Sequence, residues 1–282
     1  MRHNINFAEE LPRTYLDDFL DFYNSFYEID KEYAKQVIKE TKRYYTNPKK
    51  VEIPEYVSKL QNDWYIPLLD QVHNYTVYHD DYYFTDIFCC WDIYSRKYLQ
   101  TLKKPNLLNL MFKTSIYDFI KDEVKTVVDL GNGLGLSTAY LKQIFKNARV
   151  YGTNIKTSQQ WKITNEMGWL YDFCMVEDEK EVPNIDFLFA SEYYEHIQDC
   201  IDNIEALFAV CKPKIMYLAN SFNTQSVGHF TYYTSMNHKK YWDQKDISRQ
   251  FNNIIRANGY VNVKTKNWNN KPTLWILKEK LG

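Results

Sequence analysis

The stretch that decides the fold is residues 127–138, Val-Val-Asp-Leu-Gly-Asn-Gly-Leu-Gly-Leu-Ser-Thr. It begins as a short apolar run of the kind that forms a buried strand, and it then places glycines at 131, 133 and 135. Glycine accepts a positive φ and lets a ligand approach the backbone, because it has no Cβ. A glycine loop between a strand and a helix forms a crevice at the carboxyl end of the strand. The stretch therefore predicts a site for a nucleotide-like ligand.

Strands and helices alternate after this stretch, which predicts a parallel α/β sheet. The two closing strands are separated by Asn-Trp-Asn-Asn-Lys-Pro, a connection typical of a hairpin. We therefore predict a Rossmann-like seven-stranded mixed sheet with helices on both faces. The predicted strands are 126–130, 149–155, 173–176, 185–190, 214–219, 260–265 and 273–278, and the predicted helices are 107–121, 137–145, 158–169, 199–210 and 246–258, the last one stopped by Gly259.

Residues 1–107 carry a different pattern. Apolar positions at helical spacing predict helices over 14–45 and from 56 to 69, where Pro67 interrupts the second. Aromatic residues gather over 75–99. We therefore divide the chain into a mainly helical, aromatic-rich region over 1–107 and an α/β domain over 108–282. The first region is expected to form a lid, a substrate-binding surface or the surface of a homodimer.

The composition limits the partners and the compartment. The 282 residues carry 35 basic and 36 acidic side chains, so no global field recruits nucleic acid or an anionic membrane. The five cysteines include no CxxC pair, which fits a reducing compartment. The amino terminus has no apolar signal segment, and no run approaches the ~18 apolar residues of a membrane span. We expect a cytoplasmic protein without a membrane partner.

Over about residues 108–280 the chain resembles class I S-adenosylmethionine-dependent methyltransferases of the small-molecule type. The glycine loop is the first motif that carries the resemblance. The second is Ile-Asp-Phe-Leu-Phe-Ala-Ser-Glu-Tyr-Tyr-Glu-His-Ile at 185–197, which is similar to a strand-four motif of the family that closes in Glu-His. The glycine spacing differs from the dinucleotide fingerprint, whose third glycine falls three positions after the second. The resemblance implies S-adenosyl-L-methionine as the cofactor.

The resemblance also implies which residues bind the cofactor. Asp129 would orient its amino-acid end, and the glycine loop would pass against it. Asn154 stands where the family carries an acidic residue for the ribose hydroxyls, and it lacks the charge that strengthens such a contact. The asparagine has three possible consequences: weaker cofactor affinity, an altered cofactor or loss of activity. The predicted set is Asp129, Gly131, Asn132, Gly133, Gly135, Asn154, Ile155, Asp178 and Ser191, although a solvated acidic run accounts equally well for Asp178.

Methyl transfer to a hydroxyl group needs alignment, exclusion of water and a nearby base. The polar segment 220–238 reads as a long functional loop, and its His229 is the first candidate for the base. Glu192 and His196 follow the fourth strand on an expected helix, where their spacing would let the carboxylate hold the imidazole. A structural role for His196 is an equal alternative. The predicted catalytic residues are His229, His196 and Glu192, and the predicted substrate-binding residues are Glu195, Asn220, Asn223, Tyr232, Tyr233 and His238.

The polar loop favours O-methylation of a small hydroxylated acceptor, such as a sugar or a nucleotide sugar. One alternative is methylation of a nucleic-acid base or ribose, with the aromatics of 75–99 stacking on bases. Residues 190–193, Ala-Ser-Glu-Tyr, do not match the motif of amino-methylating DNA enzymes. A second alternative is a non-catalytic protein that retains the fold. No metal is expected, because the histidines are too dispersed for a ligand set.

Overall fold

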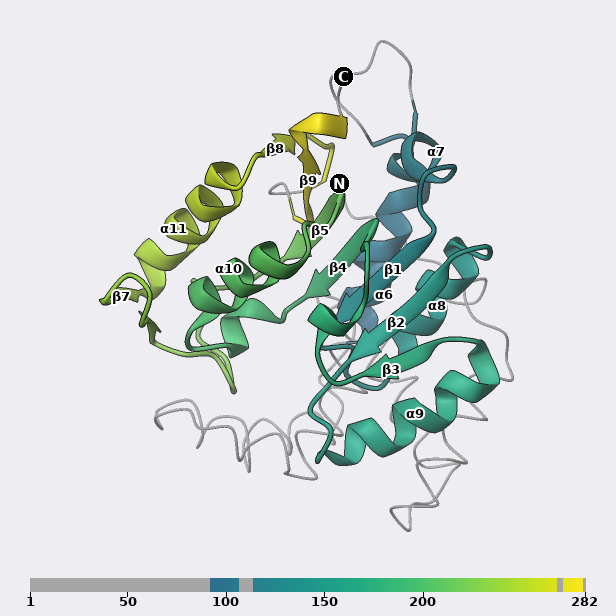
Figure 1. Cartoon of the computed structure of the whole chain (residues 1–282), viewed down its shortest axis with the longest axis horizontal. Coiled ribbons are helices and arrows are strands. Elements are labelled where there is room, and N and C mark those ends of the chain that lie inside the picture. The colour runs from purple at the N-terminus through teal and green to yellow at the C-terminus, as the bar shows by residue number, and fades with distance from the viewer. Residues whose placement is uncertain (1–91, 107–113, 268–270, 281–282) are drawn as a thin grey trace, which may run out of the picture.

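The computed structural model describes residues 92–106, 114–267 and 271–280 (Figure 1). The helices predicted over 14–45 and 56–69, and the aromatic cluster up to residue 91, lie outside the described residues. Of the region 1–107 the structure therefore gives only α6 (Asp92–Gln100), the 3-10 helix η5 (Thr101–Lys103) and the short segment that follows them. In the described part of the chain, no helix is long and apolar enough to cross a membrane.

A seven-stranded sheet forms the centre of the structure, in the order β3-β2-β1-β4-β5-β9-β8. The pairs among β1 to β5 are parallel, and β9 runs antiparallel to both β5 and β8. This confirms the predicted mixed sheet. The order reverses at β1, and such a switch point opens a crevice at the carboxyl ends of the strands. The strands are β1 (Thr126–Leu130), β2 (Arg149–Thr153), β3 (Cys174–Val176), β4 (Phe187–Ser191), β5 (Ile215–Ala219), β8 (Tyr260–Val263) and β9 (Thr273–Leu277).

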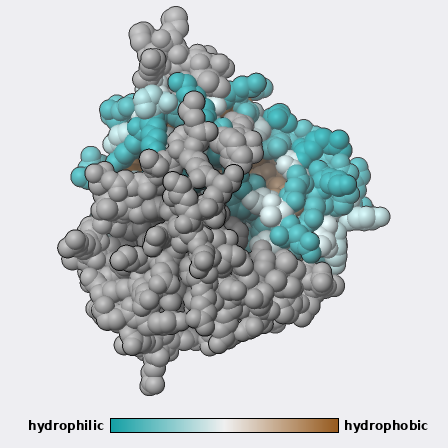
Figure 2. Space-filling model, turned by 180° about the vertical axis from the view of Figure 1, so that it is seen from behind, coloured by the Kyte–Doolittle hydropathy of each residue, from teal (hydrophilic) through white to brown (hydrophobic). Residues whose placement is uncertain are grey.

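Helices cover both faces of the sheet, because the parallel strands alternate buried side chains to either side. Val127 and Phe187 pack on one face in a core that includes α6 and α8 (Leu136–Ile144). Val128 and Leu188 pack on the other in a core shared with α10 (Cys200–Val210) and α11 (Gln244–Ala257). α9 (Gln159–Tyr171) lies beside β3. Where the described residues reach the surface in Figure 2, they are mainly hydrophilic.

Helix boundaries follow local capping. Ser158 accepts the Trp161 N–H at the start of α9, and Asp243 accepts the N–H groups of Lys245 and Asp246 at the start of α11. Gly259, with a φ of 95°, follows α11 where the sequence predicts its stop. The helix predicted over 107–121 is described only as α7 (Ile116–Ile120). The Ser115 side chain caps α7, and residues 107–113 of the predicted helix lie outside the described residues.

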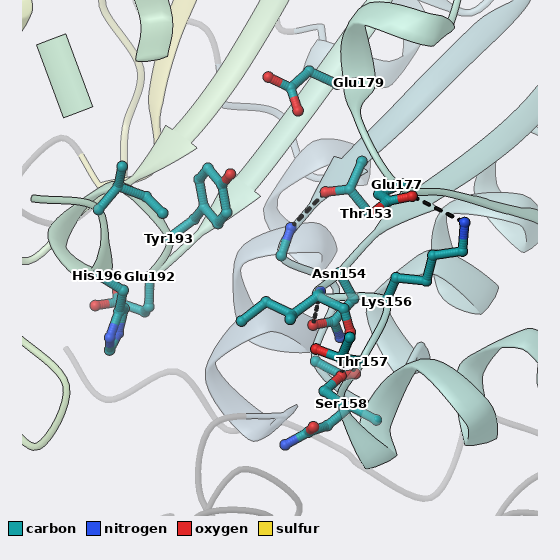
Figure 3. Close-up of a pocket in the computed structure, with 15 residues that line it drawn as sticks. Thr153, Asn154, Lys156, Thr157, Ser158, Glu177, Glu179, Glu192, Tyr193 and His196 are labelled. Atoms are coloured by element: carbon teal, nitrogen blue, oxygen red, sulfur yellow. Dashed lines mark hydrogen bonds and ion pairs between the residues drawn. The ribbon is translucent and has the colours of Figure 1, made fainter. Parts of the chain in front are cut away.

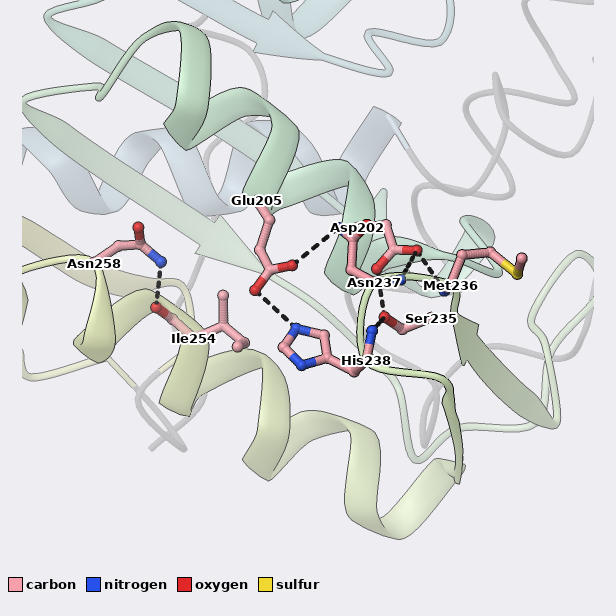
Figure 4. Close-up of polar contacts among 8 residues, drawn as sticks. All are labelled: Asp202, Glu205, Ser235, Met236, Asn237, His238, Ile254 and Asn258. Atoms are coloured by element: carbon pink, nitrogen blue, oxygen red, sulfur yellow. Dashed lines mark hydrogen bonds and ion pairs between the residues drawn. The ribbon is translucent and has the colours of Figure 1, made fainter.

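The prediction of a long loop over 220–238 is wrong in its second half. β6 (Tyr232–Ser235) and β7 (Lys240–Asp243) form a separate antiparallel hairpin. Figure 4 shows how α10 holds its turn: Asp202 accepts hydrogen bonds from the Ser235 hydroxyl and from the Met236 N–H, the latter at 2.7 Å. β-branched and aromatic residues favour strands, so Tyr-Tyr-Thr was the signal for β6.

The helix expected immediately after the fourth strand is also wrong. Glu192 has a φ of 52°, which an α-helix cannot accommodate, and only a 3-10 turn, η7 (Tyr194–His196), follows. The Glu192 N–H donates to the carbonyl of Ala219 at 2.7 Å, so the chain stays bound to the end of β5 instead of turning into a helix. The left-handed conformation of a non-glycine residue is a strained feature of the kind that gathers at functional sites.

Candidate active site

The glycine loop takes the backbone conformation that the sequence predicts. Gly131, Gly133 and Gly135 have φ values of 59°, 55° and 80°, and Gly135 is the N-cap of α8. A Cβ on Gly131 would lie 3.0 Å from Cε2 of Tyr193 and closer still to Cδ2 of the same ring. Position 131 therefore needs glycine for two reasons, its φ and the aromatic ring packed against it.

Hydrogen bonds beneath the loop fix its shape. The hydroxyls of Ser137 and Thr138 donate to Oδ2 of Asp129 at 2.6 and 2.8 Å. The Thr138 oxygen accepts in turn from the Asn132 amide at 3.0 Å, and the Asn132 N–H donates to the carbonyl of Thr153. Asp129 is 1% exposed, and this carboxylate lies under the loop. We infer that Asp129 acts on a ligand by positioning the loop above it.

Asp129 gives stability a distinct pH dependence. Burial raises the pKa of Asp129 from 3.8 to about 7. Between pH 3.8 and about pH 7, Asp129 is protonated in the folded state and ionised in the unfolded state. The free energy of unfolding therefore falls as the pH rises through this range. In urea unfolding from about pH 4 to about pH 8, the free energy of unfolding should fall less steeply with pH in Asp129→Asn than in the wild type. Asp122→Asn, at an exposed site, should follow the wild type. Identical profiles for wild type and Asp129→Asn would contradict the assignment.

Asn154 lies at the end of β2 and is bound to the glycine loop. Its amide group donates to the carbonyl of Gly133 at 2.8 Å and to Oδ1 of Asn132 at 3.4 Å. Its own Oδ1 accepts the N–H of Ile155 at 2.8 Å. A carboxylate could not donate to the Gly133 carbonyl, and this gives a physical reason for the amide at position 154.

Replacing Asn154 with the acidic residue that the family resemblance suggests should therefore be harmful. Asn154→Asp removes both donors and places a negative charge near two oxygen acceptors. We expect a lower free energy of unfolding by ~1–3 kcal/mol, and weaker binding of S-adenosylhomocysteine in calorimetry. Asn223→Asp makes the same chemical change at an exposed position and should alter neither. Tighter binding by Asn154→Asp would show instead that the carboxylate reaches the ribose.

A cavity of about 340 Å³ opens at the carboxyl ends of β1, β2 and β4. In Figure 3, Glu192 and His196 lie across it from Asn154, Lys156 and Ser158. The predicted residues that line it are Gly131, Gly133, Asn154, Ile155, Glu192 and His196. The sequence reasoning missed Thr153, Lys156, Thr157, Ser158, Gln160, Glu177, Glu179, Tyr193 and Ile197.

Two of the missed residues are acidic and flank Asp178. Glu177 pairs with Lys156 at 3.0 Å, and Glu179 is buried, which raises the pKa of the Glu179 carboxyl. Asp178 itself caps the 3-10 helix η6 (Glu179–Glu181) and pairs with Lys180 at 2.8 Å. It is not among the lining residues. The acidic run was the available signal, and its register could not be fixed without the structure.

The two histidines that the sequence proposes as bases lie in contact. Nδ1 of His196 is 3.0 Å from the carbonyl of Gly228, and Nδ1 of His229 is 2.7 Å from that of Thr224. A carbonyl only accepts, so each Nδ1 donates and each neutral ring carries its lone pair on Nε2. The ring centroids are 4.6 Å apart in an edge-to-face arrangement. Burial lowers the pKa of His229.

The two rings differ in their access to the cavity. His196 lines it, whereas His229 is 5% exposed and lies behind. Tyr233 is buried, and its hydroxyl donates to the carbonyl of Glu195 at 3.1 Å. His238 pairs with Glu205 of α10 at 2.9 Å (Figure 4). The remaining predicted residues that do not line the cavity are Asp129, Asn132, Gly135, Ser191, Glu195, Asn220, Asn223 and Tyr232.

The described residues contain no group of three or more histidine, cysteine, aspartate or glutamate side chains arranged to hold a metal ion. The sheet order, the antiparallel β9 and the glycine loop after β1 give the Rossmann-like, seven-stranded mixed sheet that the resemblance to class I S-adenosylmethionine-dependent methyltransferases implies.

No protein-family model and no curated protein matches the sequence. Among solved structures, a mitomycin 7-O-methyltransferase is similar with 11% identity and a TM-score of 0.48, over 78% of this chain and 65% of that one. An O-methyltransferase family protein from Burkholderia thailandensis has 11% identity and a TM-score of 0.46, over 85% and 70%. An O-methyltransferase of a Brevibacillus brevis polyketide synthase, in complex with S-adenosyl-L-homocysteine, has 14% identity and a TM-score of 0.38, over 50% and 48%. The chain thus spans less than two thirds of the first and third of these structures.

Proposed function

We propose that the protein is an S-adenosylmethionine-dependent methyltransferase that methylates a hydroxyl group of a small polar acceptor, with a sugar or a nucleotide sugar as the favoured class. The observation that carries the proposal is the cavity itself. The glycine loop forms one part of its wall, and His196 and Glu192 form another (Figure 3). A ligand held at the loop therefore faces groups that can bind and deprotonate a hydroxyl.

The residues present fit the cofactor. The positive φ values of Gly131 and Gly133 leave the loop backbone open to the amino-acid end of a ligand. Ile155, 41% exposed, offers apolar surface for an adenine, and Lys156 and Glu177 offer polar groups beside it. When bound, S-adenosylmethionine supplies a methyl group already activated by a positively charged sulfur. The protein's part is to align the acceptor and to exclude water.

His196 is the residue that we place as the general base. It is a histidine on the cavity wall, and the Gly228 carbonyl holds its ring with Nδ1 as the donor. Its Nε2 would take the proton of the acceptor hydroxyl. His229 packs edge-to-face against this ring and positions it. This assignment reverses the order of the two histidines that the sequence favours.

Calorimetry of the full chain with S-adenosylmethionine and S-adenosylhomocysteine tests the proposal. Saturable binding of both is expected, together with transfer of labelled methyl from the cofactor to a hydroxylated acceptor. Absence of heat with either ligand would refute the cofactor and favour a non-catalytic protein. A salt titration of oligonucleotide binding addresses the nucleic-acid alternative, because phosphate contacts give a steep dependence on salt.

A further inference from the structure

Two buried carboxyl groups meet at the end of β4, and each has one oxygen without a hydrogen-bond donor. Glu195 is 0% exposed and the side chain of Glu192 is 9% exposed. Oε1 of Glu195 accepts the N–H of Ser221 at 2.6 Å. Oε2 of Glu192 and Oε2 of Glu195 receive no donor from the residues that the structure describes. Ser221 and Lys271 bring the two carboxyls together, because the Ser221 N–H binds Glu195 and Lys271 binds both the Ser221 hydroxyl and Glu192. Two ionised carboxylates could not stay buried in this arrangement.

In the part of the chain that the structure describes, one cation reaches this pair. Nζ of Lys271 lies 2.6 Å from Oε1 of Glu192 and also donates to the hydroxyl of Ser221. The hydroxyl of Tyr98 in α6 donates to the same Glu192 oxygen at 3.1 Å. Three separate segments therefore converge on the end of β4, where Glu192 lies: α6, the end of β5 and the connection between β8 and β9.

The other described titratable groups that face the pair do not supply a second positive charge. His229, behind the cavity, interacts with Glu192 and stays neutral because burial lowers the pKa of its ring. Cys200 of α10 and Tyr233 of β6 face Glu195, and burial raises the pKa of both groups, which keeps them neutral. Among the described residues a single lysine faces the two carboxyls, so one proton would balance the charge of this group.

We propose that Glu192, Glu195 and Lys271 form one unit that holds a single proton on the buried Glu195, with Lys271 as the positioning residue that keeps Glu192 negatively charged at the cavity wall. The neutral Glu195 carboxyl donates its proton to Glu192 and so satisfies both orphaned oxygens. Burial and the neighbouring Glu192 raise the pKa of Glu195, and Lys271 lowers that of Glu192, in agreement with this distribution.

The unit carries no net charge, and this determines what it recognises. Its lysine already neutralises Glu192, so a neutral hydroxyl donor fits the carboxylate better than a cationic group does. Glu192 lies beside His196 and across the cavity from Asn154 and Lys156 (Figure 3). We assign Glu192 to the acceptor side of the cavity, an assignment that rests on the proposed function. The shared proton does not depend on it.

Nuclear magnetic resonance of the full chain labelled at the glutamate side-chain carboxyl carbon tests the proton directly. At about pH 7, above the ordinary glutamate pKa, the wild type should show a protonated carboxyl signal that is missing in Glu195→Gln and kept in Lys271→Arg. Lys271→Met should add a second protonated signal, because Glu192 then lacks its cation. Glu179→Gln assigns the signal of the other buried glutamate, and Glu166→Gln, at an exposed site, should remove only an ionised one.

The outcomes separate the two levels of the proposal. A wild-type spectrum in which every glutamate other than Glu179 is ionised would overturn the shared proton, whether or not any variant folds. A spectrum unchanged by Lys271→Met would overturn the role of Lys271. Calorimetry with S-adenosylhomocysteine then tests the acceptor side: Lys271→Met should bind within about threefold of wild type, a difference below 1 kcal/mol. A loss of tenfold or more would place Glu192 on the cofactor instead. Failure of the wild type to bind would refute the proposed function and the acceptor-side assignment, and leave the proton result standing.

Discussion

Gly131→Ala is expected to abolish measurable binding of S-adenosylhomocysteine. A non-glycine residue at a φ of 59° costs ~1–2 kcal/mol. The new Cβ would also overlap the ring of Tyr193, which lines the cavity, so the ring must move into the space that the ligand needs. Together these effects should weaken binding by ~100-fold or more, about 2.7 kcal/mol. Calorimetry measures the loss, and thermal unfolding checks that the variant folds.

Gly259→Ala is the matched control. Gly259 also has a positive φ, 95°, but its Cβ would meet only Leu277 at 3.7 Å, an ordinary contact far from the cavity. It should lose a similar amount of stability and bind S-adenosylhomocysteine as the wild type does. Partial rescue by Gly131→Ala with Tyr193→Ala would show that the ring is the obstacle. Normal binding by the single Gly131→Ala variant would remove the loop from the site.

The sequence was sufficient where a local pattern determines the structure. The apolar run that ends at Leu130 and the three glycines after it fix a strand, a turn and a helix start within a few residues. The strand and helix alternation predicts a parallel sheet because parallel strands need crossovers. The seven strands and their antiparallel end are therefore confirmed with boundary shifts of a few residues.

The candidate site was less predictable, because much of it depends on contacts between distant segments. Lys271 lies 79 positions after Glu192 in the sequence, and no pattern links them. His229 and His196 look equivalent in sequence, yet only the second lines the cavity. His238 follows β6, and the pairing of its strand with β7 places it against α10. The residue types identified the candidate site residues. Only the tertiary packing shows which of these residues line the cavity.

The departure at Asn154 shows the same limit. From sequence it reads as a lost charge at a ribose contact. In the structure its amide donates to the carbonyl of Gly133, so the residue stabilises the glycine loop from the end of β2. A role in shaping the loop needs no carboxylate, so the amide at position 154 is not by itself an argument for a non-catalytic protein. Lys156 and Glu177 line the cavity beside Asn154, and we expect these two to offer the polar groups for a ribose.

His196→Ala is expected to lower turnover strongly and to leave cofactor binding intact. Loss of a general base typically costs ~10²–10⁴-fold in rate. The imidazole lies across the cavity from Asn154 and Lys156, so S-adenosylhomocysteine should bind with an affinity close to that of wild type. Single-turnover transfer of labelled methyl, measured beside calorimetry, separates the two quantities.

Variants of the other two histidines show whether the loss of turnover comes from removing the general base or from disturbing the structure around it. His229→Ala removes only the ring that packs against His196, so it should cost less than His196→Ala and change the pH profile of turnover by freeing the base from its neighbour. His238→Ala, on the far side of the hairpin turn, should be neutral. A larger loss with His229→Ala than with His196→Ala would make His229 the base after all. The cavity wall would then have to open during the reaction, because His229 is 5% exposed in the structure described here and a base must reach the hydroxyl to accept its proton.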